Sequence, residues 1–274
     1  MGVAAIGCAY LAYSYLTLPD VRPLRTTNPS TTAFIELRAE EARSQGKEPR
    51  RVQHWLPYRQ ISEHVKRAVL VAEDAAFWDH DGVDYKQLQE SLEADWARGR
   101  FFRGGSTITQ QLAKNLYLSP SKNPVRKLRE LIIARRLEAE LQKARVLELY
   151  LNEIEWGDGI YGAEAAARTY FHKSASALGA SESAMLAACI VNPRVMNPAR
   201  PSARLARRQQ LILHRMGAVM PPVETAPPVP PPLLSEPAAA EPSSPVESGE
   251  PSPPTELLLR PDRDDPAEPA VHLK

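Results

Sequence analysis

The sequence predicts a mostly helical domain, preceded by an apolar N-terminal segment and followed by a disordered C-terminal tail. Apolar residues recur at helical spacing from Ile61 to Met220, and no strand-rich block or internal repeat interrupts them. The composition then changes sharply at Pro221. The chain has 274 residues, of which 43% are hydrophobic and 24% charged, and these values exclude a wholly disordered chain and a polytopic membrane protein.

The first segment, residues 1–19, carries no charged side chain, and Val3 to Leu18 is mostly apolar. A membrane-spanning helix needs about 20 apolar residues, so this segment is borderline in length. The basic residues that usually open a signal peptide are missing. We therefore expect a transmembrane anchor of incomplete length, with a cleaved signal peptide and a buried helix as the two alternatives.

Residues 20–54 are expected to form an extended linker and entry segment, because Pro, Thr, Ser and charged residues mix there with no sustained period. The folded domain is expected over residues 55–220. Its first helix starts near Ile61 and has a natural stop at Gly82. Capping-box spacing, a proline at a first helical position and renewed apolar stripes predict further helices over residues 107–118, 124–141, 146–151, 182–191 and 203–220.

The tail, residues 221–274, holds 16 of the 26 prolines, has no aromatic residue and has a net charge of −7. Such a segment cannot bury enough apolar surface to fold, so we expect it to be disordered. The remaining body has a net charge of +8, which favours an anionic partner such as a nucleic acid, an anionic lipid or a phosphorylated substrate. The two cysteines, Cys8 and Cys189, lie in apolar runs and are expected to be inert packing residues.

Two adjacent carboxylates, Glu73 and Asp74, end an otherwise apolar helix. Successive helical residues point about 100° apart, so these two side chains cannot face one pocket in the same way. One of them can be catalytic while the other holds structure. Taken alone, the pair would also suit a solvated acidic helix edge with His80 nearby.

Two further segments suit a phosphorylated ligand. Residues 103–115 combine a glycine turn, hydroxyls, two side-chain amides and Lys114 at a helix start, where free backbone N–H groups favour an anion. Residues 122–130 place four cations around Glu130, and cations in excess of the local carboxylate suit pyrophosphate oxygens. A capped helix and a surface ion-pair ladder are the simpler interpretations of each segment alone.

Taken together and in order, these segments resemble the signature blocks of the peptidoglycan glycosyltransferases of glycosyltransferase family 51, specifically their monofunctional biosynthetic branch. The matching blocks are residues 73–82, 104–111, 126–130 and 143–152, with a weaker fifth around Arg207-Arg208 and a further match over residues 156–166. The resemblance covers about residues 55 to 216. One block would be a weak signal, but the ordered set outweighs the simpler interpretations of each part.

The resemblance implies a lysozyme-like helical fold that polymerises lipid II at the outer face of the bacterial cytoplasmic membrane. The 4-hydroxyl of the incoming lipid II attacks the anomeric carbon of the growing strand, and undecaprenyl pyrophosphate leaves with inversion. Glu73 is then the general base and Glu130 a second essential carboxylate, which orients basic residues or helps to hold an optional divalent cation, Mg²⁺ or Mn²⁺. The implied substrate and pyrophosphate contacts are Ser106, Thr107, Gln110, Gln111, Lys114, Lys122, Arg126 and Lys127.

The implied partners are lipid II, the nascent glycan strand, the membrane and other cell-wall synthesis proteins, with no nucleic acid and no obligatory cofactor. Two residues depart from the family pattern: Lys122 stands where many relatives have arginine, and His172 where glycine is common. A transpeptidase is excluded, because Ser119 to Lys122 fits Ser-x-x-Lys but its companion motifs are absent. A lytic lysozyme-like enzyme and a non-catalytic scaffold remain as alternatives, although the first would not need the cations and the second would not need Glu73.

Overall fold

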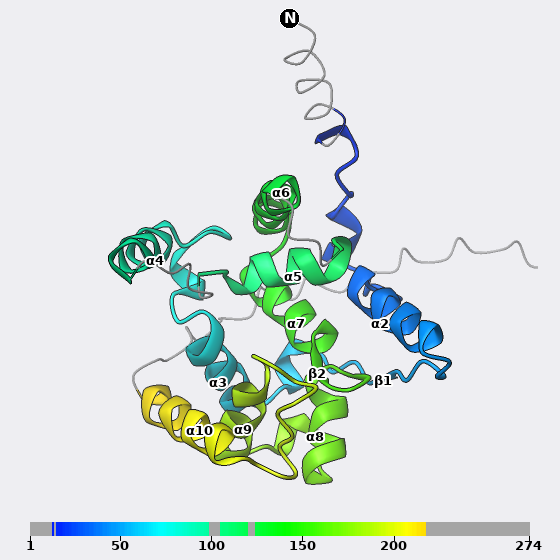
Figure 1. Cartoon of the computed structure of the whole chain (residues 1–274), viewed down its shortest axis with the longest axis vertical. Helices are drawn as coiled ribbons and strands as arrows, with labels where there is room; N and C mark the ends of the chain where they lie inside the picture. Colours follow the sequence, from blue (N-terminus) through cyan, green and yellow to red (C-terminus); the bar gives the residue numbers. More distant parts are fainter. Residues whose placement is uncertain (1–12, 14, 99–104, 120–123, 218–274) are drawn as a thin grey trace, which may run out of the picture. The chain divides into compact units, whose positions relative to one another are not determined.

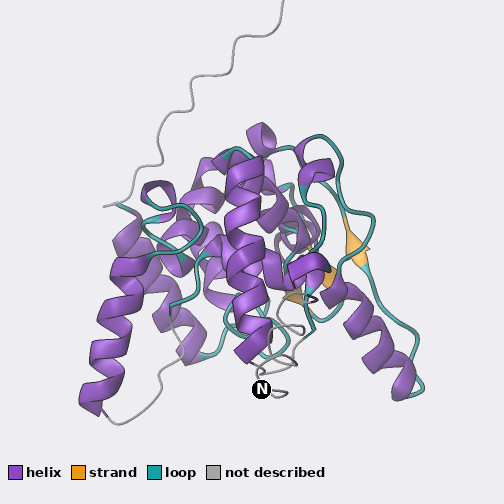
Figure 2. Ribbon diagram, turned by 90° about the horizontal axis from the view of Figure 1, so that it is seen from above, coloured by secondary structure: helices purple, strands orange, loops and turns teal. Residues whose placement is uncertain are grey.

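The computed structural model describes residues 13, 15–98, 105–119 and 124–217, all of them within the unit Met1–Val223. Helices dominate this part of the chain, and the few strands are short (Figures 1 and 2). The elements in chain order are η1 (Arg22–Arg25), α2 (Ala33–Ser44), β1 (Val52–Gln53), η2 (Tyr58–Gln60), α3 (Glu63–Glu73), η3 (Phe77–Asp79), α4 (Tyr85–Arg98), α5 (Ile108–Tyr117), α6 (Pro124–Glu140), α7 (Lys143–Glu153), β2 (Glu155–Gly157), β3 (Ile160–Tyr161), α8 (Ala163–Phe171), η4 (Ala175–Ala177), α9 (Ala180–Cys189) and α10 (Ala203–Met216). The mostly helical fold class is therefore confirmed.

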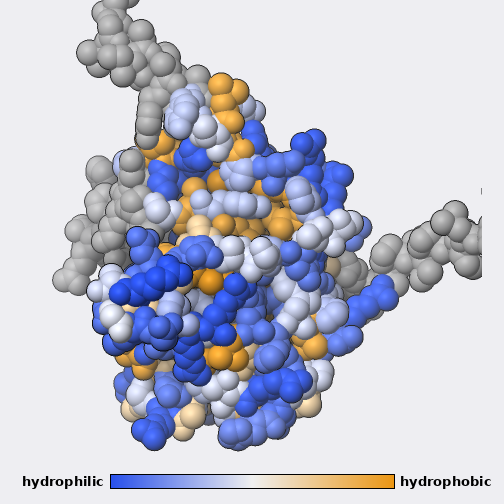
Figure 3. Space-filling view, turned by 90° about the vertical axis from the view of Figure 1, so that its right-hand side faces the viewer, coloured by the Kyte–Doolittle hydropathy of each residue, from blue (hydrophilic) through white to orange (hydrophobic). Residues whose placement is uncertain are grey.

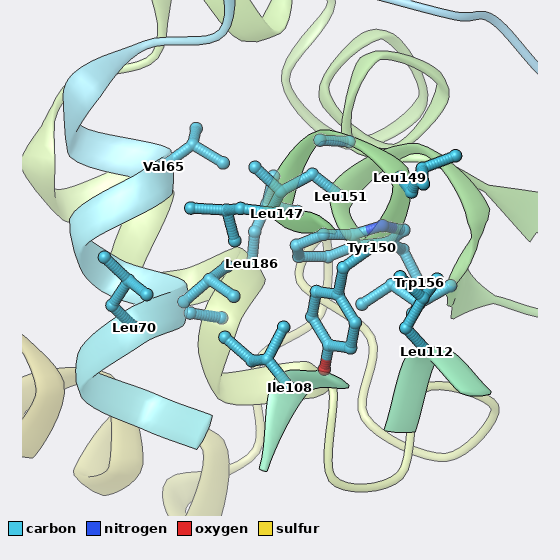
Figure 4. Packing of buried hydrophobic residues seen from close by; sticks show 14 of the residues in the cluster. Val65, Leu70, Ile108, Leu112, Leu147, Leu149, Tyr150, Leu151, Trp156 and Leu186 are labelled. Carbon is cyan, nitrogen blue, oxygen red and sulfur yellow. The ribbon is translucent and has the colours of Figure 1, made fainter. Parts of the chain in front are cut away.

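Apolar stripes on these helices meet in one buried cluster. Val65 and Leu70 of α3 face Leu147 and Tyr150 of α7 and Leu186 of α9, and all five side chains are fully buried (Figure 4). Burying a large apolar side chain contributes about 1.5–3 kcal/mol, so this cluster fixes how α3, α7 and α9 pack. In this packing the end of α3 lies next to the start of α5, and polar residues gather there.

Three short strands form a small mixed sheet. β1 pairs in parallel with β3, with Val52 opposite Ile160, and β2 pairs antiparallel with β3. Gly159 turns the chain between β2 and β3 at φ +66°, and a Cβ there would lie 2.6 Å from the carbonyl oxygen of Arg50. Only glycine allows this turn to approach the backbone of Arg50, just ahead of β1, so closely.

The prediction that residues 20–54 are extended is wrong for part of this range, because α2 lies within it. Thr32 caps this helix by accepting a hydrogen bond from the backbone N–H of Ile35, whose side chain is buried. The guanidinium of Arg38 lies 3.1 Å from the carboxylate of Glu155 and so ties α2 to β2. The helix is too polar for its sequence to show an apolar stripe, and tertiary contacts decide its position.

The first domain helix also ends earlier than expected, at Glu73 rather than near Gly82. Asp74 leaves helical geometry at φ −165° and ψ 79°, and a 3-10 turn follows it. The starts of the next two expected helices are confirmed: Thr107 caps α5 and Pro124 begins α6. Helix α4 was not predicted.

Most of the two terminal segments lies outside the described residues, including residues 1–12 of the expected anchor and all of the expected disordered tail from Pro221. Among the residues that the structure does describe, no helix is long and apolar enough to cross a membrane. The surface view in Figure 3 shows a face on which hydrophilic side chains are interspersed with apolar ones.

Candidate active site

The adjacent carboxylates at the end of α3 have separate surroundings. Asp74 is buried and accepts hydrogen bonds from the backbone N–H of Ile108, at 2.9 Å, and from the ring of His80, at 3.0 Å. It therefore joins the end of α3 to the start of α5, where backbone N–H groups lack helical partners. Glu73 points elsewhere and does not share these contacts. The expectation that one carboxylate holds structure while the other stays available is consistent with this geometry.

Glu73 is held by two side chains from distant parts of the sequence. Its Oε2 accepts a hydrogen bond from Nε2 of Gln111 at 3.0 Å, and its Oε1 lies 3.4 Å from a guanidinium nitrogen of Arg208 on α10. Burial raises the pKa of Glu73, while the Gln111 hydrogen bond and the charges of Arg208 and Lys114 oppose that rise. The carboxylate is thus a stronger base than an exposed glutamate and keeps cationic support for its ionised form.

Gln111 is itself fixed in place. Its Oε1 accepts a hydrogen bond from the hydroxyl of Tyr150 at 2.9 Å, and its Nε2 also lies 3.4 Å from the backbone oxygen of Ser106. Tyr150 is fully buried, and its phenol ring lies among Ile108, Leu112 and Trp156 (Figure 4). The hydrophobic core therefore orients the amide that faces Glu73.

Glu130 lies buried on α6 between two cations of its own helix. A guanidinium nitrogen of Arg126 lies 2.7 Å from one carboxylate oxygen, and Nζ of Lys127 lies 2.5 Å from the other. Lys127 also donates to the hydroxyl of Ser106 at 3.1 Å and to Oε1 of Gln110 at 3.3 Å. One continuous set of contacts thus runs from Glu73 through Gln111, Ser106 and Lys127 to Glu130.

Lys114 is half-buried beside this set. Burial lowers the pKa of its ammonium, and the nearby carboxylates of Glu130 and Glu73 oppose that change. No side chain in the described part of the chain forms a hydrogen bond or ion pair with its Nζ. A half-buried cation with this freedom is suited to an incoming anion.

The other expected contact residues differ in how open they are. The hydroxyl of Thr107 is buried, donates to the backbone oxygen of Gly82 at 2.7 Å and caps α5. Both contacts position the start of α5. Gln110 is also buried and faces Lys127. Lys122 lies outside the described residues. The structure brings together Ser106, Gln110, Gln111, Lys127, Arg126 and both glutamates.

Two residues that contact this network were not among the expected site residues. Arg208 belongs to the weak fifth sequence block, and its contact with Glu73 joins residues 135 positions apart. Tyr150 belongs to the fourth block, within the helix expected over residues 146–151. The block pattern could have pointed to both residues, but not to their partners.

The fourth block is otherwise structural. Lys143 donates to Glu138 at 2.9 Å and lies over the ring of Phe77, so it ties α7 to η3. Asn152 accepts from the backbone N–H of Leu56 at 2.8 Å and donates to its oxygen at 3.0 Å. The contacts of Asn152 hold α7 against the segment between β1 and η2.

The second expected role of Glu130 is to help hold a divalent cation. Both oxygens of Glu130 already face cations, and within the described ranges no group of three His, Cys, Asp or Glu side chains is placed to hold a metal ion. Of the two roles expected for Glu130, this geometry favours the orientation of Arg126 and Lys127. The buried thiol of Cys189, whose pKa burial raises to about 12, is likewise a packing group.

A partly buried carboxylate joined by hydrogen bonds to a set of cations is suited to group transfer on an anionic substrate. Sequence comparisons make this class specific. A family model described as Transglycosylase matches residues 40–217. The chain belongs to the transglycosylase family and is a peptidoglycan glycosyltransferase.

Three relatives illustrate the similarity, and each is a biosynthetic peptidoglycan transglycosylase. The protein of Dechloromonas aromatica is 48% identical over 191 residues, which cover 70% of this chain and 83% of that protein. The protein of Aromatoleum aromaticum is 52% identical over 167 residues, or 61% and 73% of the two chains. The protein of Chromobacterium violaceum is 42% identical over 217 residues, or 79% and 95%. The expected family and enzyme class are thereby confirmed.

Proposed function

We propose that this enzyme polymerises lipid II, with Glu73 as the general base. The growing glycan, tethered through undecaprenyl pyrophosphate, is the donor, and the 4-hydroxyl of the incoming lipid II is the nucleophile. The bond between that oxygen and the donor anomeric carbon forms as the bond to the pyrophosphate breaks, and the hydroxyl proton passes to Glu73. A single displacement inverts the anomeric carbon.

The observation that carries this proposal is the placement of Glu73. It is buried enough for its pKa to rise, yet it faces the amide of Gln111 and the guanidinium of Arg208, both of which support the carboxylate. A general base needs a pKa near the working pH and a fixed direction. The core supplies that direction through Tyr150 and Gln111.

The cations on α5 and α6 would bind the leaving group. Negative charge develops on the pyrophosphate as the glycosidic bond forms, so fixed cations stabilise the transition state more than the ground state. Glu130 keeps Arg126 and Lys127 within one turn of α6, and Lys114 supplies a cation with no protein partner in the described ranges. These groups need little reorganisation when the pyrophosphate arrives.

Peptidoglycan synthesis implies that the catalytic domain faces the periplasm. We propose further that residues 1–19 anchor the chain as a single pass in the inner membrane. The described part of this segment contacts α6: Arg129 donates to the hydroxyl of Thr17 at 3.0 Å, and Arg136 lies over the ring of Tyr15. The basic face of α6 would then lie next to the anionic leaflet from which lipid II is drawn.

The decisive experiment is lipid II polymerisation by the purified full chain carrying Glu73→Gln. This change preserves shape and removes the base, so the rate should fall by roughly 10²- to 10⁴-fold while binding of a donor-site inhibitor such as moenomycin persists. Glu40→Gln, at an exposed carboxylate on α2, is the matched control and should leave the rate unchanged. A Glu73→Gln enzyme with more than half the wild-type rate would reject the assignment.

The same assay separates the alternative functions. A lytic enzyme would shorten added glycan and would make no polymer from lipid II. A non-catalytic scaffold would leave lipid II unchanged, with or without Glu73. Polymer that appears in the wild type and disappears in Glu73→Gln excludes both.

A further inference from the structure

A cavity lies outside the catalytic network. It has a volume of about 400 Å³, within the range typical of small-molecule sites, and is lined by Asn28, Pro29, Arg51, Gln53, Trp55 and Glu153. These residues come from three places: the segment ahead of α2, strand β1 with its flanks, and the last residue of α7. None of them contacts Glu73, Glu130 or their partners.

The walls of this cavity are fixed by contacts between the three segments. Gln53 donates to the backbone oxygen of Asn152 at 2.9 Å, and Asn152 in turn holds Leu56. Asn28 accepts a hydrogen bond from Arg145 at 2.7 Å, and the same guanidinium lies 5.4 Å from the ring centre of Trp55. The cavity is therefore built before any ligand arrives.

Glu153 is the unexplained group in this cavity. The residue is 1% exposed, its Oε2 accepts from Gln53 at 3.2 Å, and its Oε1 has no partner among the described residues. A buried oxygen without a hydrogen bond is unfavourable, so a ligand group that donates a hydrogen bond to it would be favoured. Burial raises the pKa of Glu153 to about 7, so both protonation states occur near neutral pH.

The chemistry of the cavity selects one kind of ligand. A hydroxyl or an amide both donates and accepts, so it pairs with Glu153 in either protonation state. An ammonium group only donates and would face the charges of Arg51 and Arg145, which already act on Glu153. The half-buried indole of Trp55 adds a flat apolar surface beside these polar groups.

We propose that this cavity is a secondary saccharide-binding site, which holds an N-acetylated sugar unit of a glycan strand against Trp55 and Glu153. The apolar face of the sugar ring would lie on the indole, and its hydroxyl or amide groups would contact Glu153, Gln53 and Arg51. The source of the saccharide rests on the proposed function, because a polymerase keeps its own product nearby. Binding of the saccharide itself does not require turnover.

The test is a titration of the full chain in detergent with a soluble tetramer of β-1,4-linked N-acetylglucosamine. Binding should have a dissociation constant of about 1 mM and should shift the indole N–H resonance of Trp55, assigned with Trp55→Phe, but not that of the buried Trp156. Glu153→Met should weaken binding by about tenfold, since one hydrogen-bonding group is lost. The change removes the carboxyl that accepts a hydrogen bond from Gln53. Gln53 still donates to the backbone oxygen of Asn152, so its amide keeps a partner.

The matched control is Glu155→Met. Glu155 is also buried with an unpartnered oxygen, but it lines a different cavity, and Arg38 keeps its contact with Glu41 when Glu155 is lost. This variant should bind the tetramer within about twofold of the wild type. The Trp55 resonance in the wild-type protein supplies a result even if Glu153→Met does not fold.

Three outcomes would overturn the proposal: no binding at about 10 mM tetramer, equal binding by Glu153→Met and the wild type, or a Trp55 shift with a carboxylate-bearing peptide and none with the saccharide. The result of the Glu73→Gln experiment tests the proposed function and says nothing about this cavity. An enzyme that polymerises lipid II but fails to bind the tetramer would reject this site and leave the proposed function in place.

Discussion

At the scale of single residues, the arrangement around Glu73 balances two opposite effects. Burial disfavours the ionised carboxylate, and Gln111, Arg208 and Lys114 favour it. Burial alone would raise the pKa of this carboxyl further, and the cations alone would lower the pKa and make the carboxylate a weaker base. A substitution of Arg208 can therefore change the pKa of Glu73 without altering the glutamate itself.

Arg208→Met should raise the pKa of Glu73 further, because it removes a positive charge 3.4 Å from Oε1. A smaller fraction of Glu73 is then ionised at a given pH, so the acid limb of the kcat/KM profile should move to higher pH. Arg208→Lys keeps the charge and should restore most of the wild-type profile. Identical acid limbs in Arg208→Met and the wild type would show that Arg208 does not tune the base.

Sequence patterns identify residues at this scale but not their partners. Glu73, Gln111 and Glu130 stand in ordered motif blocks, so they could be predicted as candidate site residues. Helical geometry predicted that Glu73 and Asp74 would point apart, and they do so although Asp74 itself leaves the helix. That Asp74 would hold the start of α5 rather than meet solvent depends on how α3 and α5 pack.

At the scale of elements, helix ends position the site. α3 ends at Glu73, α5 begins with the capping hydroxyl of Thr107, and α6 carries Glu130 one turn after Arg126. Helix starts were predictable because capping side chains and proline act locally. The end of α3 was not, because Asp74 leaves helical geometry to make contacts with residues far along the chain.

His172 offers a test of local conformation. It ends α8 in the left-handed region at φ 56°, where a side chain is unfavourable by about 1–2 kcal/mol and glycine is not. His172→Gly should therefore raise the free energy of unfolding by about 0.5–1 kcal/mol, after allowing for the greater freedom of glycine in the unfolded chain. His172→Ala keeps a Cβ and should gain nothing. Denaturant unfolding of the three proteins decides between these outcomes.

At the scale of the whole molecule, the described part of the N-terminal segment contacts the domain through Tyr15, Thr17 and the partly buried side chain of Leu18. Arg129 reaches Thr17, Arg136 reaches Tyr15, and each contact is exposed at one partner or both. Exposed contacts of this kind contribute little to stability. The domain should therefore not depend on the segment to fold.

Removal of residues 1–19 should leave a folded domain that still polymerises lipid II in detergent and binds vesicles of anionic lipid weakly. The basic side chains of α6 and the lipid substrate both remain after the change. Circular dichroism, vesicle co-sedimentation and the polymerisation assay measure these properties. A folded but inactive domain would mean that the segment does more than anchor the enzyme.

Deletion of Pro221–Lys274 should leave the polymerisation rate in detergent within about a factor of two, or roughly 0.4 kcal/mol in barrier height. The segment is rich in proline and has no aromatic residue with which to join a core. Hydrogen exchange on the full chain should find its amides unprotected. Protected amides throughout the tail, or a larger loss of rate, would mean that it packs on the enzyme.

The helical class, the order of the motif blocks and the candidate site residues could be predicted from the sequence, because periodicity, capping and motif spacing are local properties. Which of those residues meet depends on how the helices pack. Glu73 contacts Gln111 across 38 positions and Arg208 across 135, and no local pattern encodes such pairs. They arise when α3, α5, α7, α9 and α10 bury their apolar faces in one cluster, because that packing brings the end of α3 to the start of α5.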